Sequence, residues 1–193
     1  MTLDLIFANI SKHILLTEVE KNYFHSKLHF RKLKKKEIYI QENQVCESAA
    51  FVLSGCLRSY TIDDNGFEHI LQFAPPDWWI TDMFSFNSQK PGTIYIDAIE
   101  VSEIILLSRA DQLDIFEKIP GFERYFRILT ENSLVSYRKR VIDGLSLTAI
   151  ERYHDFCKRY PTLIERLPQK QIASYIGVTS EFLSKIRSNV KIM

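Results

Sequence analysis

The stretch KQIASYIGVTSEFLSKIR, residues 170–187, decides how this chain folds near its C-terminal end. It predicts two short helices separated by Gly177, because glycine readily adopts the left-handed backbone conformation that ends a helix. Pro168 suits the start of the first helix, and Thr179 suits the N-cap of the second. Apolar residues at helical spacing predict a buried face shared by both helices. These residues are Ile172, Ala173, Ile176, Val178, Phe182, Leu183 and Ile186.

This pattern is typical of a helix-turn-helix unit, whose short second helix enters the major groove of DNA. Glu181 can accept a hydrogen bond from cytosine, and Lys185 can donate one to guanine. Residues at the edges of the unit suit phosphate contacts. The predicted DNA-binding residues are Gln169, Lys170, Thr179, Ser180, Glu181, Ser184, Lys185 and Arg187. The alternative is a helical hairpin that only packs, with its charged residues forming a solvated face.

The distribution of charge favours the DNA-binding interpretation. The net charge of +1 hides a balance of +5 over residues 1–36, −10 over 37–137 and +6 over 138–193. An acidic middle followed by a basic end predicts two modules, of which only the second binds a polyanion.

Composition sets further bounds. With 193 residues, 46% of them hydrophobic, the chain can form one large or two small domains. No apolar run has the length of a membrane span, and the first residues lack the features of a signal peptide, so we expect a cytoplasmic protein. The three cysteines, Cys46, Cys56 and Cys157, have no CxxC spacing. We therefore expect ordinary thiols, with redox sensing as the alternative, and no metal site.

The middle of the chain predicts an antiparallel sandwich or barrel, because short β-branched and aromatic segments recur at about 8–12-residue spacing. Asn65-Gly66 indicates a hairpin turn, since both residues tolerate the positive φ of tight turns. The predicted strand segments are EIYIQEN (37–43), AAFVLSGCLRSYTI (49–62), FEHILQF (67–73), TIYIDAIE (93–100) and EIILLSR (103–109).

Helical spacing flanks these strands. Thr17 and Glu20 form a capping-box pattern, and Gly144 is expected to end a long helix. The expected helices cover residues 3–15, 18–28, 110–118, about 121–143 and about 147–159. The long helix carries a stripe that either packs on the barrel or, as we favour, pairs with the same helix of a second chain. The stripe is Phe122, Phe126, Leu129, Ser133, Tyr137 and Val141.

This order of elements resembles the Crp/Fnr transcription regulators, relatives of the cyclic-AMP receptor protein. AAFVLSGCLRSYTIDDNGFEHILQF (49–73) is similar to the family's strand–glycine–strand–hairpin–strand segment, with Gly55 at the turn, and VTSEFLSKIR (178–187) to its recognition helix. The resemblance implies an α+β fold: an N-terminal double-stranded β-helix (jelly roll) with flanking helices, a long central dimerisation helix and a C-terminal all-α helix-turn-helix domain. The expected domains are 1–120 (sensor), 121–144 (dimerisation helix) and 145–193 (DNA binding), with the family's β-hairpin wing absent or truncated.

The family's phosphate-binding cassette corresponds to PDWWITDMFSFNSQKPGTIYIDA (76–98). Thr81-Asp82 replaces the family's Gly-Glu pair, so that Asp82 is left to bind a ribose. Gly92-Thr93 replaces Arg-Ser or Arg-Thr. Losing a charge-assisted arginine–phosphate contact costs about 10²–10³ in affinity, so we expect no tight binding of cyclic AMP. The expected effector pocket, or alternatively a collapsed core, contains Trp78, Trp79, Thr81, Asp82, Met83, Phe84, Gly92, Thr93 and Tyr95; Phe86 is a further aromatic there.

The resemblance implies a cytoplasmic homodimer, joined through residues 121–144, that reads double-stranded DNA under the control of a small effector, with RNA polymerase as a further partner. No catalytic or metal site is expected. The alternative functions are a ligand-binding or protein-interaction jelly-roll module, and a metal-dependent cupin enzyme, for which His69 supplies only one of the required histidines. The basic run RKLKKKE (31–37) is expected to be solvated, with a second DNA contact as the alternative.

Overall fold

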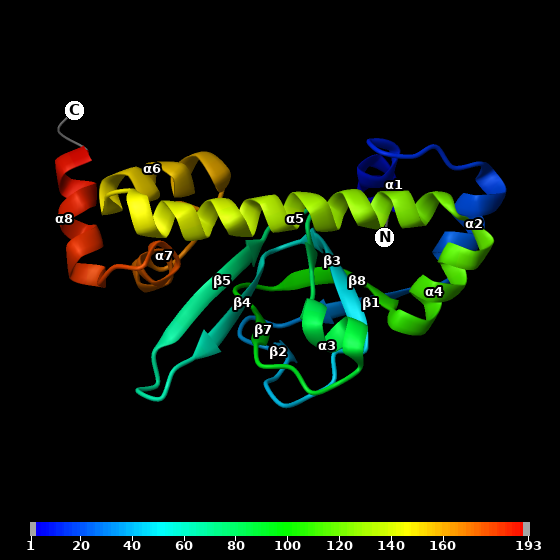
Figure 1. Cartoon of the computed structure of the whole chain (residues 1–193), viewed down its shortest axis with the longest axis horizontal. Helices are drawn as coiled ribbons and strands as arrows, with labels where there is room; N and C mark the ends of the chain where they lie inside the picture. The colour runs from blue at the N-terminus through cyan, green and yellow to red at the C-terminus, as the bar shows by residue number, and fades with distance from the viewer. Residues whose placement is uncertain (1–2, 191–193) are drawn as a thin grey trace. The chain divides into compact units, whose positions relative to one another are not determined.

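The computed structural model describes residues 3–190, with side chains up to residue 188, and it combines eight strands with eight helices in that range (Figure 1). The strands are β1 (Leu28–Leu33), β2 (Ile38–Ile40), β3 (Ser48–Ser54), β4 (Leu57–Ile62), β5 (Glu68–Ala74), β6 (Trp79–Ile80), β7 (Tyr95–Ala98) and β8 (Ser102–Ser108). The helices are α1 (Asp4–Ser11), α2 (Glu18–Ser26), α3 (Met83–Ser88), α4 (Arg109–Lys118), α5 (Gly121–Ser146), α6 (Ala149–Arg159), α7 (Gln169–Ile176) and α8 (Ser180–Val190).

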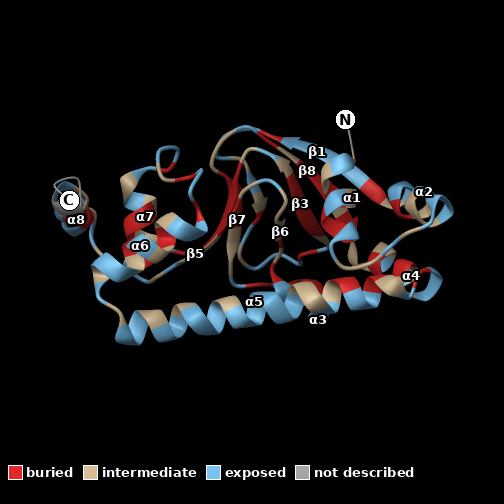
Figure 2. Ribbon diagram, turned by 90° about the horizontal axis from the view of Figure 1, so that it is seen from above, coloured by how far each residue is buried: buried red, intermediate tan, exposed pale blue. Residues whose placement is uncertain are grey.

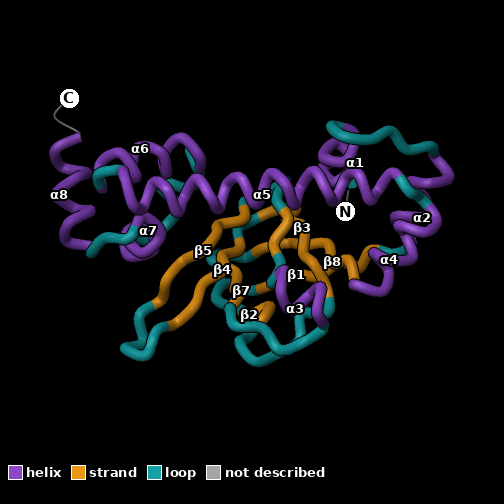
Figure 3. The backbone as a smooth tube through the Cα atoms, in the orientation of Figure 1, coloured by secondary structure: helices purple, strands orange, loops and turns teal. Residues whose placement is uncertain are grey.

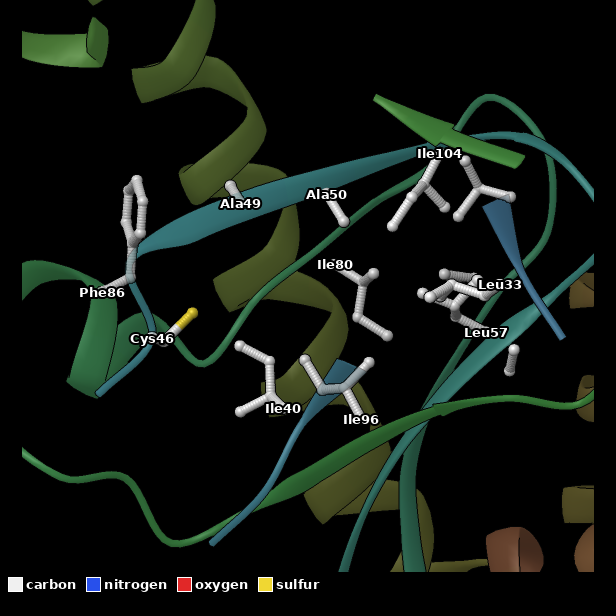
Figure 4. Packing of buried hydrophobic residues seen from close by; sticks show 13 residues of the cluster. Leu33, Ile40, Cys46, Ala49, Ala50, Leu57, Ile80, Phe86, Ile96 and Ile104 are labelled. Atoms are coloured by element: carbon white, nitrogen blue, oxygen red, sulfur yellow. The ribbon is translucent and has the colours of Figure 1, made fainter. Parts of the chain in front are cut away.

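The strands, drawn in orange in Figure 3, form two four-stranded sheets. Their orders are β1-β8-β3-β6 and β2-β7-β4-β5. Every pairing among β1, β3, β6 and β8 is antiparallel, as is that of β2 with β7. Apolar side chains from both sheets point into one interior, where Leu33, Ile80, Ile96 and Ile104 are almost fully buried (Figure 4). The predicted sandwich is therefore confirmed, and its core is the interior between the sheets.

Two predicted turns have the expected glycines. Gly55 connects β3 to β4 with φ +83°, and a Cβ at this position would lie 2.5 Å from the carbonyl oxygen of Val101. Between β4 and β5 only Gly66 has a positive φ, +79°, whereas Asn65 does not. The reason is that the turn is longer than a two-residue hairpin: Asp63 accepts the N–H groups of Asn65 and Phe67 with its carboxylate.

The chain divides into two compact units. Unit 1 comprises residues 1–59 and 73–132, and unit 2 comprises 60–72 and 133–193. The division passes through helix α5 and assigns the β4–β5 hairpin to the second unit. The boundaries expected from the sequence, near 120 and 144, stay predictions.

The first part of the predicted α5 stripe packs in unit 1. Phe122 is fully buried, and Phe126 and Leu129 lie against the same cluster of α1, α2, α4 and barrel side chains. Beyond residue 132 the helix is largely exposed (Figure 2). Its exposed apolar residues are Leu134, Val135, Tyr137, Val141, Ile142 and Leu145. The predicted stripe therefore mixes two faces: a buried one in unit 1 and an exposed one near the C-terminal end of α5.

Several predicted boundaries were wrong. Helix α5 continues through Gly144 to Ser146, because this glycine keeps a helical φ and Leu147 still donates to the carbonyl of Asp143. Strand β1 was missed altogether. The basic run 31–37 begins on it, and Arg31 and Lys32 pair with Glu37 and Glu103.

Candidate nucleic-acid interface

Helices α7 and α8 form the predicted two-helix unit. Gly177 ends α7 with φ +73°, and its N–H and that of Val178 donate to carbonyls in the last turn. Thr179 caps α8, its hydroxyl accepting the N–H of Phe182 at 3.2 Å. The buried side chains of the pair are Ile172, Ala173, Ile176, Leu183 and Ile186. The turn chemistry and most of the shared apolar face are thus confirmed.

Phe182 was predicted to belong to this buried face, and that prediction was wrong. Its side chain is 48% exposed, whereas Leu183 and Ile186 are at 0% and 3%. Successive residues on a helix are about 100° apart. Leu183 and Ile186 already define the direction of the core, so Phe182 lies to one side of it.

Most predicted DNA-binding residues lie at the surface. Lys170, Thr179, Glu181, Ser184 and Lys185 are exposed. Hydrogen bonds to its own backbone N–H and to Thr179 lower the pKa of Glu181, so its carboxylate is ionised near neutral pH. The outward groups of α8 thus include one anion and one cation that suit base edges.

The remaining three, Gln169, Ser180 and Arg187, are half-buried. Gln169 is partly committed inside the unit, because its side-chain amide donates to the carbonyl of Ser180 at 2.9 Å. It braces α7 against the first turn of α8, so only its remaining donor and acceptor are available to a phosphate.

Sequence analysis missed two residues that attach the β4–β5 hairpin to this unit. The hydroxyl of Ser174, on α7, donates to the carbonyl of Glu68 at 2.6 Å and accepts the N–H of Ile70 at 3.0 Å. Arg140, on α5, donates to the carbonyls of Ile70 and Leu71 on β5 and to that of Tyr175. β5 is the outer strand of its sheet. These two side chains therefore satisfy backbone groups that an edge strand leaves unpaired; nothing in the local sequence marks them.

Removing the Ser174 hydroxyl is expected to release this part of β5. In Ser174→Ala the amide of Ile70 loses its acceptor, and the hydrogen–deuterium exchange of that amide should accelerate about 10-fold or more, the equivalent of a lost hydrogen bond. Exchange measured residue by residue checks this. The matched variant Ser188→Ala, which alters an exposed serine of α8, should leave Ile70 unchanged. Equal exchange rates in wild type and Ser174→Ala would show that the bond contributes nothing.

Helices α5, α6 and α7 surround a cavity of about 320 Å³ with a basic lining. Its cations are largely engaged within the unit. Lys139 pairs with Asp143 and Asp155 at 2.5 and 2.7 Å, and Arg152 donates to the carbonyls of Leu147 and Ile176. Lys139 thus links α5 to α6, and Arg152 places its charge at the C-terminal ends of α5 and α7, where a cation is favoured.

The cassette segment forms helix α3, and Asp82 is its N-cap. One carboxylate oxygen of Asp82 accepts the N–H of Ser85 at 3.1 Å. The other is buried and has no hydrogen-bond partner among the residues that the structure describes. If residue 92 had a side chain, its Cβ atom would lie only 2.1 Å from this oxygen. A carboxylate therefore fills the space beside the position where the family places its phosphate-binding arginine.

The other expected pocket residues divide between interior and surface. Trp79 is committed to unit 1: its indole N–H donates to the hydroxyl of Tyr125 at 2.9 Å, and its ring lies against Phe51 and Phe126. Trp78 packs against the barrel interior with Phe86, and Thr81 lies 3.2 Å from the sulfur of Cys46. Met83, Phe84 and Thr93 are exposed, and Tyr95 bonds to Glu42. Of these predicted residues, Asp82 and Gly92 lie directly against each other.

A side chain at position 92 is expected to destabilise the protein. Gly92→Ala should lower the free energy of unfolding by about 1–3 kcal/mol, because the new methyl group overlaps the capped Asp82 carboxylate, and Asp82→Ala/Gly92→Ala should recover part of the loss. Urea unfolding checks both variants.

Gly92→Arg should not create tight cyclic-AMP binding, as measured by calorimetry, since Asp82 occupies the adjoining space. Nanomolar binding by Gly92→Arg would contradict this account.

The described residues give no support to metal or thiol chemistry. Within residues 3–190 no group of three or more His, Cys, Asp or Glu side chains is placed to hold a metal ion. His69 pairs with Asp63 of the hairpin turn at 2.8 Å. Burial raises the pKa values of the Cys46 and Cys157 thiols, which makes them less reactive. Over the same range, none of the helices has both the length and the apolar character that a membrane crossing requires.

Known proteins share this arrangement. The family model for a cyclic nucleotide-binding domain matches residues 30–118. The regulatory protein HlyX of Actinobacillus pleuropneumoniae is 24% identical over 165 residues, which cover 80% of this chain and 68% of HlyX. FixK2 from Bradyrhizobium japonicum has a similar structure, with a TM-score of 0.74 at 20% identity over 86% of this chain and 85% of FixK2. The c-di-GMP-responsive regulator CLP from Xanthomonas campestris gives a TM-score of 0.74 at 12% identity, covering 91% and 92% of the two chains.

These matches and the fold define a class: proteins with a cyclic nucleotide-binding domain followed by a long helix and a helical C-terminal unit. A solved Crp/Fnr-family transcriptional regulator from Eubacterium rectale shares the fold, with a TM-score of 0.70 at 18% identity over 92% of this chain and 84% of that one. The matching cyclic nucleotide-binding domain, the similarity to HlyX and the fold shared with this regulator all support the resemblance to the Crp/Fnr family that the sequence shows.

Proposed function

We propose that this protein is a sequence-specific DNA-binding transcription regulator of the Crp/Fnr type, and not an enzyme. The observation that carries the proposal is the outward face of α8. Leu183 and Ile186 anchor this helix, while Glu181, Ser184 and Lys185 remain exposed. A short, anchored helix with polar groups on its free side is what the major groove admits. Relatives of this chain are regulators, and a regulator of this kind acts in the cytoplasm, where the DNA lies.

The active form would be a homodimer joined along α5. Leu134, Val141 and Leu145 repeat at steps of seven and four residues and are at least 59% exposed in the single chain. A stripe of this spacing on a long helix suits pairing with its own copy. Pairing would place two copies of α8 for two half-sites, and RNA polymerase would be a further partner at the promoter.

A small effector other than cyclic AMP would set the activity. The buried, unpartnered oxygen of Asp82 beside Gly92 favours a hydrogen-bond donor over an anion. Binding would shift the population of the dimer between arrangements with different spacing of the two α8 helices.

Binding of the full chain to genomic fragments, titrated with salt, tests the proposal. A DNA-binding regulator should retain specific fragments, and the logarithm of its affinity should fall linearly with the logarithm of the salt concentration. Retention of no fragment at any salt concentration would instead favour a ligand-binding or protein-interaction module. Size-exclusion chromatography with light scattering tests the dimer, and Val141→Asp should shift it to monomer.

A further inference from the structure

Phe182 is an aromatic side chain on an otherwise polar surface. The other exposed residues of α8 up to residue 188 are Glu181, Ser184, Lys185 and Ser188. Phe182 is 48% exposed, although burying such a ring stabilises a protein by about 1.5–3 kcal/mol. The helix does not need it for anchoring, because Leu183 and Ile186 are buried. Its exposed apolar surface is therefore available to a binding partner.

The position of Phe182 on the helix indicates which part of a DNA groove it would meet. At about 100° per residue, Phe182 lies about 40° from the buried Ile186 and, in the other direction, about 60° from the exposed Lys185. It is thus on the flank of the helix, next to the cation, and it would face the side of the groove when Glu181 and Lys185 face the base edges.

The backbone around Phe182 is held firmly. Its N–H donates to the Thr179 hydroxyl at 3.2 Å, and Gln169 donates to the carbonyl of Ser180 at 2.9 Å. Phe182 is the third residue of α8, and in helix-turn-helix proteins the N-terminal residues of the second helix contact the bases. The ring is therefore presented at a fixed place in the turn that would enter the groove.

The apolar group that DNA displays in its major groove is the 5-methyl group of thymine, which phenylalanine can contact. We propose that Phe182 is a specificity-determining residue that contacts the 5-methyl group of a thymine in each half-site, beside the base read by Lys185. The inference rests on the proposed function, since it requires that α8 enters the groove. Contact with Phe182 would thus select a thymine-containing base pair in each half-site, which the polar residues of α8 alone do not specify.

The thymine methyl can be removed without changing base pairing. An operator is first selected from random duplexes with the wild-type protein, and deoxyuridine then replaces each thymidine in turn. Covering one methyl group contributes about 0.8 kcal/mol, or about fourfold in affinity. Wild-type protein should bind about fourfold more weakly when the methyl is lost at one half-site, and about 15-fold more weakly when it is lost at both. Phe182→Ala should bind the thymine and uracil duplexes equally.

Phe67→Ala is the matched control, because Phe67 is also an exposed phenylalanine, at 62%, but lies in the hairpin turn. It should keep the full methyl dependence of the wild type, and thermal unfolding should show that both variants are folded. The proposal is overturned if no uracil substitution weakens the wild type, or if one weakens wild type and Phe182→Ala equally. If the wild type selects no operator at all, the proposed function fails, which is a separate result.

Discussion

Replacing Lys185 by glutamate is expected to weaken operator binding about 30- to 10⁴-fold. A good side-chain contact to guanine contributes about 1–3 kcal/mol, and a dimer makes it twice. The substituted carboxylate would also face the phosphate backbone, which repels it. Lys185 is exposed and has no hydrogen bond or ion pair with any residue that the structure describes, so its replacement should not alter folding. Fluorescence anisotropy with a labelled operator, at fixed salt, measures the loss.

Lys118→Glu provides the control, because it changes the charge by the same amount at an exposed position at the end of α4. If α8 is the reading helix, this variant should bind DNA within about twofold of the wild type, since an exposed charge that does not contact the DNA is largely screened at 0.1 M salt. Two results would count against α8 as the reading helix: normal binding by Lys185→Glu, or an equal loss in both variants. Loss of thermal stability in Lys185→Glu would instead point to a packing role for this helix.

Local chemistry made the helix-turn-helix unit predictable. Gly177, Thr179 and Pro168 act within one or two residues of their own positions, and the structure places all three at helix ends as the sequence predicts. Phe182 shows the limit of that reasoning. Spacing alone groups it with Leu183 and Ile186, and on α7 the same spacing does bury all three of Ile172, Ala173 and Ile176. Which apolar residue stays outside depends on the neighbouring helix.

Contacts between distant segments were not predictable. Ser174 lies 106 residues from Glu68, and its hydrogen bonds to β5 follow from the tertiary fold. Trp79 was assigned to the effector pocket because it is aromatic and lies in the cassette, yet it bonds to Tyr125, 46 residues away. A single sequence gives no information on such pairs. The charged strand β1 was also not predicted, because four of its six residues are exposed and break the apolar alternation of a half-buried strand.

Asp97→Ala is expected to reduce the free energy of unfolding by about 3–5 kcal/mol, because it leaves a buried arginine without its carboxylate. Arg58 on β4 donates to both oxygens of Asp97 on β7, at 2.8 and 3.0 Å, and their side chains are only 8% and 9% exposed. Both residues belong to unit 1. Urea unfolding followed by tryptophan fluorescence measures the change, because Trp78 and Trp79 lie in the same unit.

The exposed pair Arg31–Glu37 serves as the comparison, since its side chains are 42% and 33% exposed. Solvent screens such a pair, and Glu37→Ala should change stability little. The variant Arg58→Met/Asp97→Leu then separates two contributions. If the penalty in Asp97→Ala comes from the unpaired charge, removing both charges should restore most of the stability, because a buried ion pair and a well-packed apolar pair are often similar in free energy. If the double variant is as unstable as Asp97→Ala, the hydrogen bonds between β4 and β7 themselves hold the sheet together at this point.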